Sequence, residues 1–360
     1  MSVSINYRLQ ASSQFLTQHC CCLLLALLFA VGGCDNSAVD STALNSRSVI
    51  DMAGVRHDVV LDVQRIGTLG SVPVLNTFVE ALGAGDKIYN SPSAFHDIHN
   101  RWKMHKEFAP QIAEGPAFQS ANHELLLENI MAAKPDLCLT MSRNMTEPLN
   151  KLGIPTLYID WDTLEKMQAS IRLLGEVLDR QDTAQAYLAY FDQQLKKAKT
   201  LSQQIPQEKR LRVLYGSPLN PRCPEALTEL WIELAGGRSV TAANCRLPRQ
   251  SYDVEDLLRW DPEVIFVIQA SDLQQLRQDA KLRHLNAVRH NRLLVAPTVG
   301  HMWGGRTIEA PVATLWMLHK LYPGLLSREI LAEEIAGFYQ RFFNYSMSDK
   351  QVADIIDGTL

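Results

Sequence analysis

The chain has 360 residues, of which 46% are hydrophobic and 21% are charged, and its formal net charge is −4. This composition is that of an ordinary globular protein with room for two domains, and it excludes a chain that is disordered over most of its length. The mildly acidic balance also argues against a nucleic-acid-binding protein, which would carry a strongly basic patch.

The N-terminus has the pattern of an export signal. Arg8 precedes an apolar run over residues 20–31, which is too short to span a membrane and has the length of a signal-peptide core. The run ends in Val-Gly-Gly-Cys34, which resembles a bacterial lipobox, whose cysteine is acylated. We therefore expect a lipoprotein signal peptide at 1–33 and a lipid anchor on Cys34, with a plain secretory signal as the alternative. Residues 34–56 are small, polar and aperiodic, which predicts a flexible tether.

Strands and helices alternate from there to residue 161. We expect strands at 64–68, 87–89, 137–141 and 156–159, and helices at 74–82, 96–108, 124–133 and 147–152. Such alternation is typical of a mostly parallel sheet covered by helices on both faces. Residues 57–161 are therefore predicted to form an N-terminal α/β lobe.

Residues 162–205 have the periodicity of a helix. Apolar residues recur in steps of three and four, with no glycine after Gly175. A helix of this length would extend roughly 60 Å and would connect two domains. The pattern lapses between Leu178 and Tyr187, so a helix pair broken at residues 179–182 is the alternative, and the same lapse disfavours a coiled coil.

The alternation resumes in residues 206–360. We expect strands at 212–215, 264–268 and 293–296, and helices at 225–235, 254–260, 273–288 and 309–321, followed by a helical tail. This segment is predicted to be a C-terminal α/β lobe. The predicted fold class is therefore α/β, with two doubly wound lobes of mostly parallel sheet bridged by one long helix.

A short sequence pattern occurs once in each lobe. Glu128 lies seven residues before Pro135, and Glu255 lies seven residues before Pro262. In both places a short helix is expected to end at the proline and a continuous apolar strand to follow. The two lobes are therefore predicted to repeat one structural unit.

Ligands of open α/β sheets bind beyond the carboxyl ends of the strands, so the residues that follow each strand are candidates for a ligand site. Tryptophan can stack on a planar ligand, arginine pairs with carboxylates and oxyanions, and neighbouring glycines allow close approach of the backbone. For Trp303 the alternative is a side chain that packs inside its lobe. The candidate ligand-binding residues are Trp303, Arg306, His301, Trp102, Arg143, Arg101 and Arg222.

Two further groups of residues suggest special chemistry. His96, His99 and His105 are a candidate metal site, since imidazole is a common ligand of iron, nickel and zinc. Their spacing does not place them on one helical face, so a solvated helix is the alternative. Cys223 and Cys245 lie in polar loops, and in an oxidising compartment a disulfide between them is one of two outcomes, the other being free thiols.

Taken together, the lipobox, the order of lobe, helix and lobe, and the paired Glu-to-Pro patterns resemble the periplasmic substrate-binding proteins of ABC importers for iron–siderophores, haem and vitamin B12. The resemblance covers about residues 59–345. It implies a protein outside the cytoplasmic membrane, lipid-anchored, without catalysis and without an intrinsic cofactor. Its ligand would be an iron(III)–siderophore or a related metal chelate, held between the lobes and delivered to an ABC permease dimer with its ATPase.

The resemblance also assigns a role to the paired glutamates. Glu128 and Glu255 would dock on permease arginines, one from each lobe, which suits a two-fold symmetric partner. The alternative is that each glutamate only stabilises the N-terminus of its own helix.

Several other functions stay open. The helical tail after Leu325 is similar to branches of the family linked to metal chelates or metal ions rather than to vitamin B12, but cobalamin, haem, metal ions and oxyanions remain alternative ligands. The two-lobe plan is also similar to that of metal chelatases, although the sequence has no nucleophile elbow, P-loop, HExxH motif or dinucleotide fingerprint. A lipid-anchored scaffold is the third class. We expect a monomer.

Overall fold

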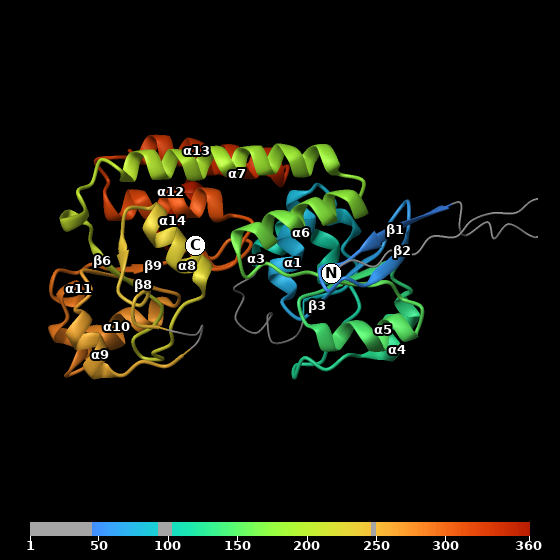
Figure 1. Cartoon of the computed structure of the whole chain (residues 1–360), viewed down its shortest axis with the longest axis horizontal. Helices are drawn as coiled ribbons and strands as arrows, with labels where there is room; N and C mark the ends of the chain where they lie inside the picture. The colour runs from blue at the N-terminus through green and yellow to red at the C-terminus, as the bar shows by residue number, and fades with distance from the viewer. Residues whose placement is uncertain (1–44, 93–102, 246–249) are drawn as a thin grey trace, which may run out of the picture. The chain divides into compact units, whose positions relative to one another are not determined.

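The computed structural model describes residues 45–92, 103–245 and 250–360. In the first half of the chain its elements are β1 (Ser46–Ile50), β2 (Arg56–Val60), β3 (Ile66–Leu69), α1 (Val72–Ala81), η2 (Gly85–Lys87), α3 (Lys103–Phe108), η3 (Pro110–Ala113), α4 (Leu127–Ala133), β4 (Leu137–Thr140), η4 (Arg143–Met145), α5 (Thr146–Lys151), β5 (Thr156–Tyr158), α6 (Leu164–Val177) and α7 (Gln181–Ser202) (Figure 1).

The second half contains η5 (Gln207–Lys209), β6 (Arg212–Tyr215), α8 (Ala226–Leu234), β7 (Arg238–Ser239), α9 (Val254–Trp260), β8 (Val264–Val267), α10 (Ala270–Gln278), η6 (Leu282–His284), α11 (Asn286–Arg289), β9 (Leu293–Val295), α12 (Ala310–Leu321), α13 (Arg328–Phe342) and α14 (Asp349–Asp357). Within the described ranges, no helix is both long and apolar enough to cross a membrane.

The two lobes share one sheet topology. In the N-terminal lobe β4 pairs with β3 and β5, and Ile88 forms a single parallel bridge to Ile66 of β3 where a strand at 87–89 was predicted. In the C-terminal lobe the order is β7-β6-β8-β9, all parallel. In each lobe the chain adds its second strand on one side of the first strand, β3 or β6, and its third strand on the other side. Each sheet is therefore doubly wound, with a switch point beside its first strand. This confirms the predicted fold class.

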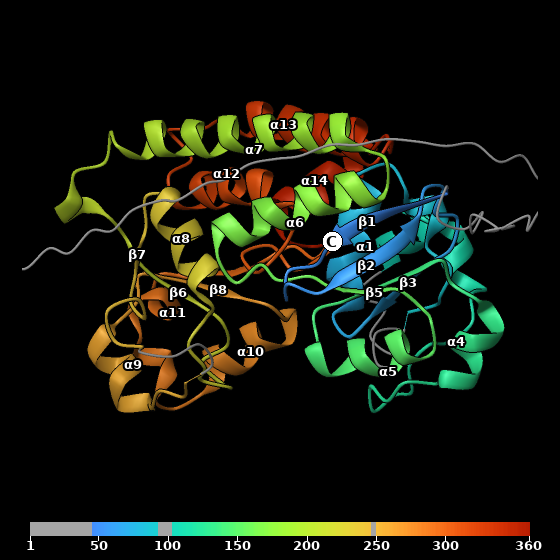
Figure 2. The ribbon, with the colours of Figure 1, turned by 45° about the vertical axis from the view of Figure 1, so that its right-hand side comes forward.

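The central strands have no exposed face. Every residue of β3, β4 and β8 is buried, as expected for continuous apolar runs covered by helices on both sides. One hydrophobic cluster extends from the N-terminal lobe through α6 and α7 into the C-terminal lobe, so the lobes share a core. Figure 2 shows α7 and α13 running together along the side of the molecule away from α4 and α9.

The connection between the lobes is two helices, so the prediction of one long helix is wrong. Helix α6 ends next to Asp179, which has a left-handed φ of +56°, and α7 begins two residues later. A Cβ placed on Gly175 would lie 2.6 Å from the Cβ of Ala184, so α6 turns back close to α7. Helix α6 packs on α1, whereas α7 packs on α12. The break lies where the apolar periodicity lapses.

A further correction concerns the tether. Residues 46–60 form an antiparallel hairpin of β1 and β2 instead of a flexible segment. The carboxylate of Asp51 accepts hydrogen bonds from the backbone N–H of Ala53 and of Val55, both at 2.9 Å, and so fixes the turn. Only Val49 of β1 is buried, which is why the sequence appears polar there. The remainder of the predicted tether, the signal peptide and Cys34 lie outside the described residues.

The predicted helix at 273–288 is also interrupted. Helix α10 ends at Gln278, and the Asp279 carboxylate accepts hydrogen bonds from the backbone N–H of Lys281 and Leu282, at 2.8 and 2.9 Å. Such a side-chain contact to the backbone starts a new turn rather than continuing the helix. The chain then proceeds through η6 and the short α11.

Candidate ligand-binding site

A cavity of about 750 Å³ lies at the carboxyl ends of the first strands of both lobes. Tyr215 and Gly216 at the end of β6 and Gln269 after β8 form part of its wall, and Ser71, directly after β3 and Gly70, contributes from the other lobe. The chain diverges from β6 to β7 on one side and to β8 on the other, which leaves a crevice between the following loops. The cavity therefore occupies the position predicted for a ligand.

The charges on the cavity wall balance. The guanidinium of Arg306 lies against the carboxylate of Glu225, with Nε 2.6 Å from Oε2, and both side chains are partly buried. Arg222 and Asp272 are the other charged residues of the wall within the described part of the chain. Two cations and two anions cancel formally, so the cavity suits a polar ligand with a small net charge of its own.

Trp303 faces away from this cavity, and its predicted role in stacking on a ligand is wrong. The side chain is fully buried and lies edge-on against Trp316, with ring centroids 6.1 Å apart. It anchors the loop from Pro297 to Arg306 to the interior of the lobe, because the shared core gives an indole more apolar contact than a solvent-filled cavity does. This was the alternative left open by the sequence.

The glycines after Trp303 allow the loop to press against β6. Gly304 has φ +96°, and a Cβ there would lie 2.3 Å from the ring of Tyr215. The Tyr215 hydroxyl donates to the carbonyl of Trp303 at 2.5 Å, and the Trp231 indole N–H donates to the carbonyl of Gly305 at 3.2 Å. The backbone of the loop is therefore fixed, and His301 and Arg306 are presented to the cavity.

The structure separates the predicted ligand residues into three groups. His301, Arg306 and Arg222 meet at the cavity wall. Arg143 is exposed in η4, with its guanidinium 4.6 Å from the ring centroid of Tyr158, and does not line the cavity. This cavity does not support its predicted contact with a ligand, although β4, the strand that precedes it, lies beside the switch point of its lobe. Arg101 and Trp102 lie outside the described residues.

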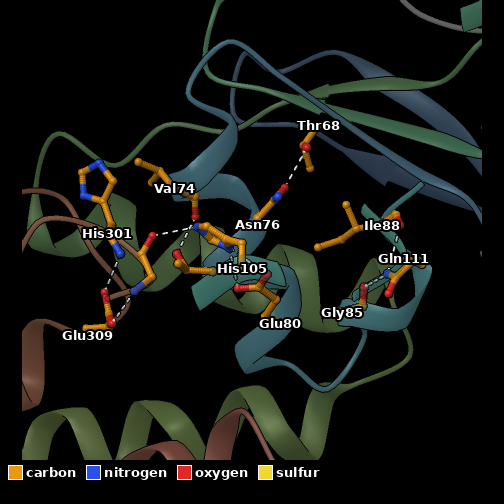
Figure 3. A network of polar contacts seen from close by, with 12 residues as sticks. Thr68, Val74, Asn76, Glu80, Gly85, Ile88, His105, Gln111, His301 and Glu309 are labelled. Carbon is orange, nitrogen blue, oxygen red and sulfur yellow. Dashed lines mark hydrogen bonds and ion pairs between the residues drawn. The ribbon is translucent and has the colours of Figure 1, made fainter. Parts of the chain in front are cut away.

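A buried ion pair lies beneath the cavity loop (Figure 3). His105 of α3 has Nδ1 2.8 Å from the carboxylate of Glu80 in α1, and its Nε2 lies 2.8 Å from the carbonyl oxygen of Gly300. Burial lowers the pKa of the His105 imidazole, but the Glu80 carboxylate outweighs this and raises the pKa above its ordinary value. Burial raises the pKa of Glu80, and His105 offsets only part of that rise.

Glu309 holds the same loop from the C-terminal lobe. Its buried carboxylate accepts hydrogen bonds from the backbone N–H of Gly300 at 3.0 Å and of His301 at 2.8 Å, and from the hydroxyls of Thr307 and Tyr339. A Cβ on Gly300 would lie 2.5 Å from the Thr77 methyl of α1, so the lobes touch at this point. Both lobes therefore fix the position of His301.

These contacts correct the predicted role of His105 as a metal ligand. Both ring nitrogens of His105 are engaged by Glu80 and Gly300, and the side chain is fully buried. His96 and His99 lie outside the described residues. Among the residues that the structure describes, no group of three His, Cys, Asp or Glu side chains could hold a metal ion.

Cys223 and Cys245 form a disulfide, with their Cα atoms 6.0 Å apart. Cys223 is buried, lines the cavity and follows Arg222 directly, so the bond ties the loop after β6 to the segment after β7. The free cysteine of the described chain, Cys138, is buried in β4, and burial raises the pKa of its thiol to about 12.

The two Glu-to-Pro patterns adopt the same structure. Helices α4 and α9 each have seven residues, with Glu128 and Glu255 exposed in their first turns. Each helix ends in a left-handed residue, Lys134 at φ 49° and Asp261 at φ 42°, directly before the proline and a buried strand. The repeat predicted from the sequence is confirmed, and the docking role of its glutamates remains a prediction.

Sequence reasoning missed part of the wall. Ser71, Tyr215, Gln269, Asp272 and Gln275 line the cavity and were not among the predicted site residues. Gln269 and Asp272 follow β8, so the rule of inspecting each strand end would have found them if it had been applied to that strand. Tyr215 is within β6 and carried no such signal.

Two α/β lobes of one topology, with a ligand-sized cavity at their switch points, define a two-lobe ligand-binding protein rather than a module without a ligand. The chain belongs to the periplasmic binding protein family, whose family model matches residues 78–299. Membership places the protein in the periplasm, and proteins of this family bind solutes for transport.

Individual relatives agree with this assignment. A vitamin B12-binding protein of Pectobacterium atrosepticum is 26% identical over 180 residues, which is 48% of this chain and 63% of that protein. The chain spans about three fifths of the length of the curated relatives it matches.

Solved structures share the fold. A periplasmic solute binding protein of Veillonella parvula has a TM-score of 0.73 at 23% identity, covering 87% of this chain and 97% of that one. A molybdate periplasmic binding protein of Haemophilus influenzae has a TM-score of 0.72 at 19% identity, covering 84% and 99%. At such identities the likeness concerns the fold alone.

Proposed function

We propose that the protein captures an iron(III)–siderophore or a related metal chelate in the cavity between β6, β8 and the loop after β3. It then delivers the chelate to an ABC importer, composed of a permease dimer and its ATPase, while a lipid on Cys34 keeps the protein at the membrane. The observation that carries the proposal is the cavity at both switch points in a member of the periplasmic binding protein family.

The size of the cavity supports a chelate over a bare ion. Its volume of about 750 Å³ falls in the range of about 300–1,000 Å³ that holds organic ligands of drug size. A bare metal ion is smaller than a water molecule, and a small oxyanion occupies only a few times the ~30 Å³ of one, so either would leave most of this space unfilled.

The wall chemistry supports the same choice. Arg306, Arg222 and His301 can donate to the oxygen atoms at the rim of a chelate, and Asp272 and Gln269 can accept from its amide or hydroxyl groups. The balanced charges favour a chelate whose ligand neutralises most of the charge of the metal. Cobalamin is the second candidate, because relatives with detectable sequence identity are named vitamin B12-binding proteins.

A thermal-shift screen of the purified protein tests the proposal. The ligands are ferric siderophores of several types, cobalamin, haem, divalent metals and molybdate. A ligand present at 100 times its Kd should add about 2.7 kcal/mol to the free energy of unfolding, which is a readily measured shift. We expect a ferric siderophore to raise the melting temperature selectively. A rise in the melting temperature with cobalamin alone would make cobalamin, the second candidate, the ligand instead of a siderophore.

Two arginine variants locate the binding. Arg306→Gln should reduce the shift because it removes a cation from the wall, whereas Arg143→Gln, which changes an arginine outside the cavity, should leave the shift intact. Equal shifts in both variants would place the ligand elsewhere. No shift with any of the compounds would contradict the proposed function.

A further inference from the structure

A glutamate on the wall of the ligand-binding cavity turns its side chain away from its own helix. Glu225 is the N-cap residue of α8 and has an extended backbone, but its side chain forms no capping hydrogen bond. Serine, threonine, aspartate and asparagine are the residues that usually cap a helix, so α8 does not depend on a glutamate at this position. The carboxylate lies instead against Arg306, which is distant in the sequence, with Oε2 2.6 Å from Nε.

The ion pair occupies a position that would attract an anionic ligand. Both residues line the cavity, and their side chains are 25% exposed for Arg306 and 28% exposed for Glu225. The guanidinium carries a permanent positive charge, and the nine-residue helix α8 adds the positive end of its dipole beside it. The Glu225 carboxylate therefore lies where the anionic group of a ligand would otherwise be favoured.

The pair cancels the charge of Arg306 without removing its capacity to donate hydrogen bonds. A guanidinium has five N–H donors, so contact with one carboxylate leaves it able to donate to neutral oxygen atoms of a ligand. A second negative charge at Arg306 would meet the carboxylate of Glu225, and like charges at close range weaken binding. Without the charge of Glu225, Arg306 and Arg222 would be opposed by Asp272 alone among the charged residues of the described wall.

We infer that Glu225 is a specificity-determining residue, which selects neutral or cationic chelates and excludes anionic ones. This inference rests on the proposed function and narrows its ligand to a chelate such as a ferric trishydroxamate, in which three hydroxamate groups neutralise the charge of iron(III). Glu225 supplies from within the protein the anion that Arg306 would otherwise take from the ligand.

The test compares one iron chelate in three charge states. A linear ferric trishydroxamate carries one positive charge when its terminal amine is free, no net charge when the amine is acetylated and one negative charge when it is succinylated. Quenching of tryptophan fluorescence measures the Kd of each form for the purified chain. The parent chain should bind the succinylated form more weakly than the acetylated form, because only the succinylated form brings another carboxylate into the cavity.

Removal of the charge of Glu225 should change this preference. Glu225→Gln should raise the affinity for the succinylated form relative to the acetylated form by about fivefold, the upper end for partly exposed charges, and Glu225→Ala should do the same. The gain should shrink at high ionic strength, because salt screens partly exposed charges. It should vanish in the double variant Glu225→Gln with Arg306→Gln, since the cation that attracts the succinyl group is then missing.

The matched control is Glu233→Gln. It neutralises an exposed glutamate of the same helix, α8, that does not line the cavity. Its ratio of affinities for the succinylated and acetylated forms should equal that of the parent chain.

The outcomes separate this inference from the proposed function. An unchanged ratio in both Glu225 variants, or a gain that persists in the double variant, would overturn the role of Glu225 and leave the proposed function in place. If no form of the chelate binds the parent chain, the proposed ligand class fails and molybdate decides the inference. A rise in the melting temperature with molybdate in Glu225→Gln, absent from the parent chain and the double variant, would support the role of Glu225, and no such rise would overturn it.

Discussion

The two lobes share one sheet topology but use their polar side chains differently. Among the described residues, the N-terminal lobe buries many of its polar groups, including Thr68 bonded to Asn90 and the pair Glu80–His105. The C-terminal lobe also buries polar groups, such as Glu309, but it supplies most of the polar groups of the cavity wall, among them Arg222 and Asp272. The repeat therefore sets strand order, switch point and the short helix with its exposed glutamate in both lobes, while the loops that follow the strands carry most of the cavity wall.

The largest effect is expected at the buried Glu80–His105 pair of the N-terminal lobe, which contacts the C-terminal lobe through the carbonyl of Gly300. Glu80→Ala would leave a buried imidazolium without its partner, and loss of one member of a buried pair costs about 3–5 kcal/mol in the free energy of unfolding. Urea denaturation of the parent chain and of Glu80→Ala measures this difference in the free energy of unfolding. The control is Lys151→Ala, which breaks the exposed pair with Glu147 and should change little. Similar effects in both variants would contradict a special role for the buried pair.

The next effect concerns the C-terminal lobe alone. Replacing both Cys223 and Cys245 by serine should lower the free energy of unfolding by about 3 kcal/mol, because the unfolded chain regains the freedom of the closed loop. A reductant should destabilise the parent chain by a similar amount. Cys138→Ala in the N-terminal lobe should leave this sensitivity to reductant intact, and a lost sensitivity would show that the wrong thiols had been assigned.

The third effect is a pH dependence that belongs to the N-terminal lobe. The pKa values of His105 and Glu80 are both raised in the folded state, from 6.5 and 4.5, so the folded protein holds these protons more tightly than the unfolded chain. The contribution of His105 is complete below pH 6.5 and is lost as the pH rises through its folded pKa. Denaturation at pH 6 and pH 9 should show a smaller decrease for His105→Gln than for the parent chain, and parallel decreases would contradict this assignment.

Much of the fold was predictable because alternating strands and helices specify a parallel sheet locally. The Glu-to-Pro patterns also identified the repeat, since a proline after a short helix marks its end in either lobe. The errors came from tertiary contacts. The turn at Asp179 has a left-handed residue that propensity does not identify, and the hairpin at residues 46–60 has one exposed face and therefore few apolar residues.

The location of the site could be predicted from the sequence, but only some of the residues that line it could. Strand ends identified His301, Arg306 and Arg222, because the topology brings them to one edge of the sheet. The direction of a side chain on a loop depends on what lies behind it, and the sequence contains no sign that Trp316 would receive Trp303. The buried partners of His105 come from α1 and from a loop almost 200 residues later, which no local pattern connects.

The turn between α6 and α7 also bears on how the chain can be divided. The arm before the exposed Asp179 packs on α1, and the arm after it packs on α12. A break in the backbone at this point would leave each fragment with the helix that packs on its own lobe, and the contact between α6 and α7 would remain between the fragments. We therefore expect the two fragments to reassemble into the folded protein, because they share one hydrophobic core.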